Sequence, residues 1–207
     1  MPATNPEAVA KRPYDLGKRM EHMDQNRSAI LRAARQQLED RGYRELTMAS
    51  LAAASGVTRQ TIHNLFGTKA AVIEALFDVL ALDGGMENMR EVMIQPSPEA
   101  MLERFVEVMC DFWSGNRLLF RRVHGIAAID PVLGAVLDAR NHRRLMGATR
   151  IAGLSGVRDH LDQTAAALAA LTSFEFYDAL VGDALNPDQA TAGILSLARD
   201  LLARMRS

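Results

Sequence analysis

The polar residues of the segment RQTIHNLF, residues 59–66, form the set best suited to binding a partner rich in hydrogen-bonding groups. Ile62 and Phe66 stand four positions apart, so a helix places them on one face and leaves the polar side chains on the other. Such side chains hydrogen-bond to base edges and phosphates, and here they are Arg59, Gln60, Thr61, His63 and Asn64. The spacing predicts a helix that reads the major groove of DNA.

Two short helices and a tight turn must position that face. Thr47 is expected to cap a helix through Leu51, and Gly56 provides the permissive backbone for a sharp turn. Thr58 then caps the second helix, so that Gly56–Val57–Thr58 joins the two as in a helix-turn-helix. The alternative is an ordinary helical hairpin that binds nothing.

The flanking segments favour the DNA-binding interpretation. Before the pair, Ile30, Leu31, Ala34 and Leu38 recur at helical spacing. After it, Thr68 can cap a largely apolar helix over residues 70–82, with Lys69 in its first turn. The helix-turn-helix is therefore expected to be one layer of a packed domain.

The stretch ILRAARQQLEDRGYRELTMASLAAASGVTRQTIHNLFGTKAAVIEAL resembles the N-terminal domain of the tetracycline-repressor (TetR) family of bacterial transcription regulators. Its landmarks are Gly42–Tyr43, Thr47, the turn from Ala52 to Thr58, and Phe66 followed by Lys69. The resemblance covers about Arg27 to Leu80. The chain departs from the family at residues 63–65, where His-Asn-Leu replaces the usual Tyr-His-Tyr.

This resemblance implies an all-α, ligand-responsive repressor that acts as a homodimer on a pseudo-palindromic double-stranded DNA operator. Arg59 and Gln60 are expected to read base edges. Thr47, Thr61, His63 and Lys69 are expected to hold phosphates, with Thr58 and Asn64 completing the DNA-binding set. The first tyrosine of the usual family triplet commonly contacts phosphate, and His63 stands in its place.

Length and composition agree with a helical protein of about nine helices. The chain has 207 residues, of which 5% are aromatic, and alanine and leucine are abundant. We expect a flexible basic arm or helical extension over residues 1–26, the DNA-binding domain over 27–80, and an effector-binding and dimerisation domain over 81–207. A solvated tail is the alternative for the arm.

Charge, cysteine usage and hydropathy limit which partners and which compartment the sequence is compatible with. The net charge is −1, and residues 1–80 hold 11 Lys/Arg against 9 Asp/Glu, so local placement of basic residues must supply DNA affinity. The single cysteine, Cys110, excludes an internal disulfide and fits the cytoplasm. No apolar run is long enough to span a bilayer, and no signal peptide is evident, so we expect a soluble protein without a membrane partner.

The second unit contains strong helix starts at Ser97–Pro98, Asp130–Pro131 and Asn186–Pro187. Two long helices are expected at its end, one from Asp159 through Leu180 and one from Asn186 through Met205. The first is rich in small residues, which allow close helix approach in a four-helix bundle made by two chains. Plain helix propensity is the alternative explanation. The family resemblance also implies dimerisation through the last two helices.

An apolar or aromatic small-molecule effector is expected in the second unit, because the family pattern implies a pocket there. The predicted contacts combine adaptable apolar side chains with two histidines. They are Met86, Met89, Phe105, Met109, Trp113, Phe120, His124, His142, Met146 and Phe176. Ordinary core packing is the alternative for each of them. No cofactor is expected, and the five scattered histidines predict no metal site.

Two other functions compete with the regulator. The first is an enzyme built on a helical domain, for which Glu175 and Asp178 are the nearest approach to paired carboxylates. No phosphate loop, nucleophile elbow or paired cysteine supports it, so we expect no enzymatic activity. The second is a protein-interaction adaptor, which would explain the helices and leave the turn unexplained.

Overall fold

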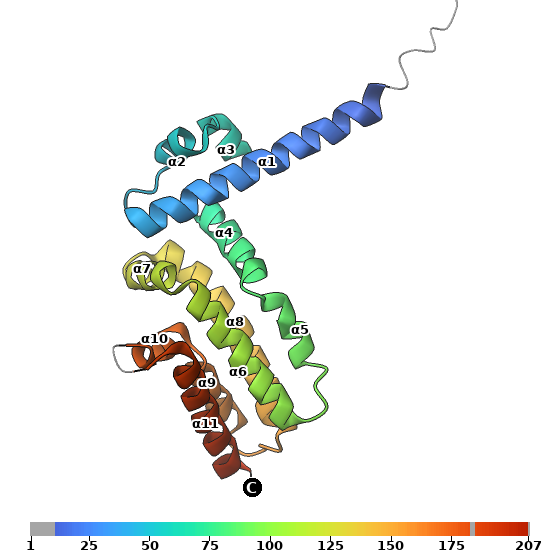
Figure 1. The fold of residues 1–207 in the computed structure, drawn as a ribbon, viewed down its shortest axis with the longest axis vertical. Coiled ribbons are helices and arrows are strands. Elements are labelled where there is room, and N and C mark those ends of the chain that lie inside the picture. Colours follow the sequence, from blue (N-terminus) through green and yellow to red (C-terminus); the bar gives the residue numbers. More distant parts are fainter. Residues whose placement is uncertain (1–10, 183–184, 207) are drawn as a thin grey trace, which may run out of the picture. The chain divides into compact units, whose positions relative to one another are not determined.

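The computed structural model describes residues 11–182 and 185–206, except the side chains of residues 11–16. These residues contain α-helices and a short 3-10 helix and no strand, which confirms the all-α prediction (Figure 1). The described chain has eleven α-helices rather than about nine. They are α1 (Lys11–Asp40), α2 (Met48–Ser55), α3 (Arg59–Phe66), α4 (Lys69–Asp83), α5 (Met89–Val92), α6 (Pro98–Gly115), α7 (Arg117–Ala127), α8 (Pro131–Leu154), α9 (Leu161–Leu171), α10 (Phe174–Leu180) and α11 (Pro187–Met205), with the 3-10 helix η2 (Met86–Asn88) before α5.

The chain divides into two compact units, Met1–Ala75 and Leu76–Ser207, with the boundary inside α4. We call them the N-terminal unit and the C-terminal unit. In the N-terminal unit, one face of α1 is buried from Ile30 to Leu38 against the helices that follow. Leu51 of α2 and Ile62 of α3 are fully buried in the same core. The apolar spacing of the sequence therefore correctly predicts this core.

Helix α1 extends well before the core of its unit. It is 30 residues long, and its residues 17–25 are all exposed. The predicted arm over residues 1–26 is therefore helical from Lys11 onward. Residues 1–10 of that arm lie outside the described residues.

The C-terminal unit is built around α6, which buries eight side chains. Helices α11, α5 and α8 contact it, and α8 packs along α9, which in turn contacts α11 (Figure 1). Ser97, Asp130 and Asn186 accept backbone hydrogen bonds as N-caps, each followed by a proline. These three predicted helix starts are confirmed.

The prediction of one long helix over residues 159–180 is wrong, because the chain breaks between α9 and α10. Thr172 turns its hydroxyl back onto the carbonyl of Leu168, at 3.0 Å. Its own carbonyl accepts a hydrogen bond of 3.0 Å from the indole of Trp113. Ser173 then caps a new helix by accepting from the amide of Phe176. Helix α9 therefore ends because the hydroxyls of Thr172 and Ser173 bond to nearby backbone groups and the indole of Trp113 binds the Thr172 carbonyl.

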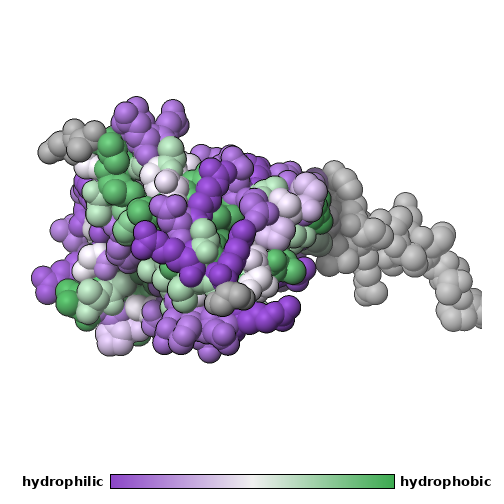
Figure 2. Space-filling view, turned by 90° about the horizontal axis from the view of Figure 1, so that it is seen from below, coloured by the Kyte–Doolittle hydropathy of each residue, from purple (hydrophilic) through white to green (hydrophobic). Residues whose placement is uncertain are grey.

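None of the described helices is long and apolar enough to cross a membrane. On the face drawn in Figure 2, hydrophilic side chains interrupt the hydrophobic ones. Several large apolar side chains are nevertheless exposed, among them Ile94, Ile129 and Leu197.

Candidate nucleic-acid interface

Helix α2 begins with a reciprocal cap that also ties it to α1. The Thr47 hydroxyl accepts from the amide of Ser50, and the Ser50 hydroxyl accepts from the amide of Thr47. Gln37 of α1 donates to the Ser50 carbonyl at 2.9 Å, and its own amide oxygen accepts from the Ser50 hydroxyl at 2.8 Å. The cap and the glutamine together fix the first helix of the pair on the body of the unit.

The turn between α2 and α3 has the geometry that its residues predict. Gly56 adopts φ 72°, a left-handed conformation that favours glycine, and its N–H donates to the carbonyl of Ala52 at 3.1 Å. Thr58 then accepts from the amide of Thr61 at 3.1 Å and starts α3. Both predicted threonine caps are confirmed.

The outer face of α3 is polar and exposed. Arg59, Gln60, His63 and Asn64 are exposed, whereas Thr61 is half-buried beside Thr58. The amide of Gln60 donates to Asn64 at 2.9 Å, and the His63 ring lies 2.9 Å from the carbonyl of Gly67. These contacts stay within one helical turn, so they hold the side chains in place without covering them.

Arg59 is the residue of this face best placed for an external contact. It is the first residue of α3, and it makes no hydrogen bond or ion pair with the residues that the structure describes. A guanidinium presents five N–H groups in a fixed fork that matches the acceptors of guanine and of phosphate. The N-terminus of α3 also carries the positive end of the helix dipole, which attracts an anion such as phosphate to the same place.

Lys69 points toward its own unit. Its ammonium lies 3.5 Å from the centroid of the Tyr43 ring and 3.4 Å from the Tyr43 carbonyl. This cation–π contact ties the start of α4 to the loop after α1. It brings together Tyr43 and Lys69, which the spacing in the sequence alone did not connect.

Two further positioning residues were missed from the sequence. Arg27 of α1 lies over the Phe66 ring, 5.0 Å from its centroid, at the end of α3. Gln37, which holds Ser50, lies one position before Leu38 in the same helix. Neither follows the apolar periodicity, so only the distance across the fold reveals their partners.

In the C-terminal unit, four of the predicted effector contacts are buried. They are Phe105, Met109, Trp113 and Phe120. The rings of Trp113 and Phe120 meet edge to face at 4.9 Å, and both contact Phe174 at the start of α10. His124 lies against the same cluster, with its ring 4.8 Å from that of Phe174.

The other predicted effector contacts are spread over the unit. Met86, Met89 and Phe176 are half-buried, while His142 and Met146 are exposed on α8. The structure therefore joins His124 to the aromatic cluster and leaves the two α8 residues at the surface.

The two carboxylates that resemble an enzymatic pair have separate partners on α7. The Glu175 carboxylate lies 2.6 Å from Nδ1 of His124, and this hydrogen bond lowers the pKa of Glu175 to about 2. Asp178 accepts from Arg117 and Arg121 at 2.6 and 2.8 Å. Burial alone would raise the pKa of Asp178, but these two guanidinium contacts lower it. Both groups tie α10 to α7.

Residues 30–76 match a protein family described as bacterial regulatory proteins, tetR family. This chain is 32% identical over 87 residues to the HTH-type transcriptional regulator EthR of Mycolicibacterium smegmatis. That stretch spans 41% of this chain and 40% of EthR, so the chain matches less than half the length of this relative. The resemblance inferred from the sequence is confirmed.

The fold extends the likeness over most of the chain. A solved protein from Syntrophomonas wolfei, assigned to the TetR family, matches with a TM-score of 0.70 at 19% identity, covering 87% of this chain and 96% of its own. A TetR transcription regulator from Haloarcula marismortui matches with a TM-score of 0.67 at 17% identity, covering 89% and 99%. At these identities the likeness establishes the fold.

Proposed function

We propose that this chain, whose residues 30–76 match the tetR family of bacterial regulatory proteins, is a transcription regulator. It binds a DNA operator and releases it when a small molecule binds. The single observation that carries the proposal is the exposed polar face of α3. The Thr58 cap starts this helix, and Arg59, its first residue, makes no hydrogen bond or ion pair with the described residues. An enzyme or an adaptor would have no need of this face.

The DNA contacts belong to residues 27–80. Arg59 and Gln60 read base edges, with Thr58 and Asn64 beside them in the groove. Thr47, Thr61 and His63 bond to phosphates, which orient the helix on the duplex. Lys69 reaches a phosphate only by leaving the Tyr43 ring, so its contribution to DNA affinity is smaller than that of Arg59.

Residues 81–207 supply dimerisation and effector binding. The dimer forms through the last helices, where α11 exposes the large apolar side chain of Leu197. A two-fold dimer sets two α3 helices about one DNA turn, or a multiple of it, apart on a pseudo-palindromic operator. Repression follows, because a dimer seated on a promoter blocks polymerase.

The effector shifts the dimer toward a spacing that the operator does not fit. Ligand binding and DNA binding then oppose each other through a coupling free energy of about 1–3 kcal/mol. The apolar and aromatic side chains of the C-terminal unit, among them Trp113 and Phe120, favour an effector with an apolar or aromatic body.

Fluorescence anisotropy with duplexes from the DNA upstream of the chain's own gene tests the proposal. The wild type should bind one duplex selectively and lose affinity steeply as salt rises. Arg59→Ala should weaken binding to that duplex by about 1–3 kcal/mol and relax the sequence preference at the position it reads.

Arg158→Ala is the matched control, because Arg158 is also exposed but lies in the C-terminal unit. It should leave DNA affinity unchanged. If Arg59→Ala weakens binding equally on every sequence, Arg59 contacts phosphate and its base contact is refuted. If the wild type shows no selective binding, the regulator proposal fails.

A further inference from the structure

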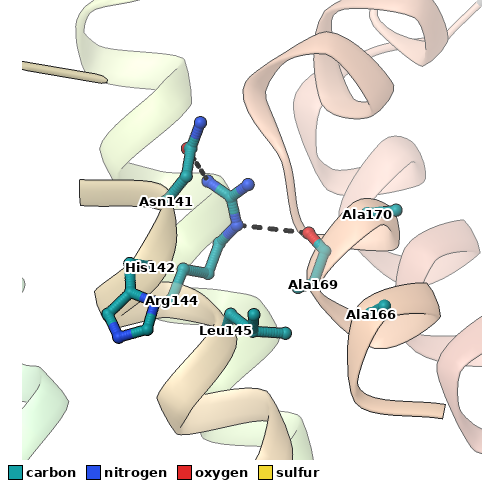
Figure 3. A pocket seen from close by; sticks show the side chains of 7 residues that line it. All are labelled: Asn141, His142, Arg144, Leu145, Ala166, Ala169 and Ala170. Atoms are coloured by element: carbon teal, nitrogen blue, oxygen red, sulfur yellow. Dashed lines mark hydrogen bonds between the residues drawn. The ribbon is translucent and has the colours of Figure 1, made fainter. Parts of the chain in front are cut away.

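A depression of about 400 Å³ lies between α8 and α9 of the C-terminal unit (Figure 3). Asn141, His142 and Arg144 of α8 line its polar part. Leu145 and three alanines of α9 line its apolar part. The depression therefore has a cationic side and an apolar side, and no acidic residue lines it.

The guanidinium of Arg144 is half-buried and bonded only to neutral groups. Its Nε donates to the carbonyl of Ala169 at 3.1 Å, and its Nη1 donates to Oδ1 of Asn141 at 3.0 Å (Figure 3). A guanidinium has five N–H groups, so three remain without an acceptor among the described residues. Burial lowers the pKa of Arg144, while the charge of Glu175 opposes that change. The Glu175 carboxylate itself is bonded to His124.

Arg140, one turn earlier on α8, shows what Arg144 lacks. Its guanidinium donates to the carboxylate of Asp78 at 2.6 Å and lies over the ring of Phe77. Both arginines are half-buried, yet among the described residues only Arg140 has a carboxylate within ion-pair distance. A partly buried cation with no carboxylate in direct contact is poorly compensated, and an anion bonded to it is favourable.

A purely structural role explains only part of the Arg144 geometry. Ala169 lies in the last turn of α9, where carbonyls lack helical partners and a cation is favourable. That role uses the Nε edge of the guanidinium. The remaining edge is available for a planar acceptor with two oxygens, which a guanidinium binds through parallel hydrogen bonds.

We propose that the depression between α8 and α9 binds a small carboxylate with an apolar body, its carboxylate bonded to Arg144 and its apolar part lying on the alanines of α9. His142, exposed on α8 at the same depression, is the second polar contact. The proposal rests on the proposed function only in identifying this ligand as the effector. Binding itself is independent of DNA.

Isothermal titration calorimetry on the full chain tests the site, with octanoate and benzoate as probes and their primary amides as neutral controls. The acids should bind, and the amides should bind at least tenfold more weakly. Arg144→Gln should weaken acid binding about 10- to 100-fold, since it removes charged hydrogen bonds. Arg143→Gln is the matched control, because Arg143 is exposed on the same helix and does not line the depression.

Asn141→Asp provides a second variant that leaves the guanidinium and the packing in place. It converts the neutral acceptor of Arg144 into a carboxylate at the same position, so acid binding should fall at least tenfold while the fold is retained. This variant decides the matter even if Arg144→Gln fails to fold. Equal binding of acids and amides, full acid binding by Asn141→Asp, or no acid binding by the wild type overturns the site.

Operator binding with and without octanoate separates this inference from the proposed function. Octanoate binding together with weaker operator binding supports the carboxylate as effector. Octanoate binding that leaves operator affinity unchanged refutes its role as effector. A wild type that binds octanoate and no DNA refutes the proposed function, and the calorimetric result for the site still holds.

Discussion

Helices α3 and α10 are nearly the same length, with eight and seven residues, and they begin in the same way. Thr58 caps α3 and Ser173 caps α10, each by accepting a backbone N–H three residues later. Their side chains, however, have opposite partners. The polar residues of α3 bond within four positions of themselves, as in Gln60 with Asn64. The carboxylates of α10 bond to α7, which for Asp178 and Arg117 is 61 positions away.

The difference separates an exposed polar surface from one already bonded within the fold. Helix α3 buries Ile62 and keeps its polar face outward, so its hydrogen-bonding groups remain accessible to the operator that we propose. Helix α10 buries Phe174 and Tyr177, and both of its carboxylates are bonded to side chains of α7. Carboxylates that are already bonded to neighbouring side chains stabilise the packing of α10 on α7 and are poorly suited to acid–base catalysis.

The largest effect should come from removing the ring that anchors α10. Trp113→Ala deletes a buried side chain and leaves the Thr172 carbonyl without its indole donor. We expect the free energy of unfolding of the C-terminal unit to fall by about 3–5 kcal/mol. Urea denaturation followed by far-UV circular dichroism measures the loss.

Trp113→Phe is the control, since it keeps a ring in the cluster and removes only the N–H. It should cost about 1–3 kcal/mol, the penalty of an unpaired buried carbonyl. Hydrogen exchange in α3 should stay unchanged in both variants. If exchange rises as much in α3 as in α10, the stability of α3 also depends on Trp113, and its contacts are not merely local.

These helices also mark how far the sequence predicts the structure. The caps at Thr47, Thr58, Ser97, Asp130 and Asn186 depend on residues within three positions, so each was predictable. The break between α9 and α10 combines the local cap at Ser173 with a hydrogen bond from Trp113, which lies 59 positions before Thr172. No local pattern carries the contact with Trp113. For the same reason the sequence predicted the polar face of α3 and missed the contacts of Gln37 and Arg27.

A matched pair of cap removals sharpens the comparison at a smaller scale. In Thr58→Ala, water can reach the amide freed at the exposed start of α3, so the loss of stability should be about 0.5–1 kcal/mol. In Ser173→Ala, the hydroxyl that is lost is buried, so the amide of Phe176 stays unpaired and the loss should be about 1–2 kcal/mol. Thermal unfolding of the two variants gives the ranking.

Thr58→Ser and Ser173→Thr retain the accepting oxygen and should stay close to the wild type. Amide exchange within α3 should rise in Thr58→Ala alone. The reverse order, with the Thr58 cap costing more than the Ser173 cap, would mean that α3 depends on its cap for more than local order.

The smallest effect should come from the exposed carboxylate of α10. Because the hydrogen bond from His124 lowers the pKa of Glu175 to about 2, its contribution is present above the unfolded-state pKa of about 4.3. It is lost as the pH falls from there toward 2. The Glu175 side chain is 64% exposed, so screening by water limits the contribution to less than about 1 kcal/mol.

Glu175→Gln should therefore flatten the acid limb of the stability curve between pH 5 and pH 3, measured as urea midpoints. Glu87→Gln is the control, because Glu87 is exposed and its side chain makes no hydrogen bond or ion pair among the described residues. Its acid limb should coincide with that of the wild type. Coincident limbs for Glu175→Gln and the wild type would show that the His124 contact adds nothing to stability. Asp178 would then be the carboxylate of α10 that holds this helix on α7, through its two arginines.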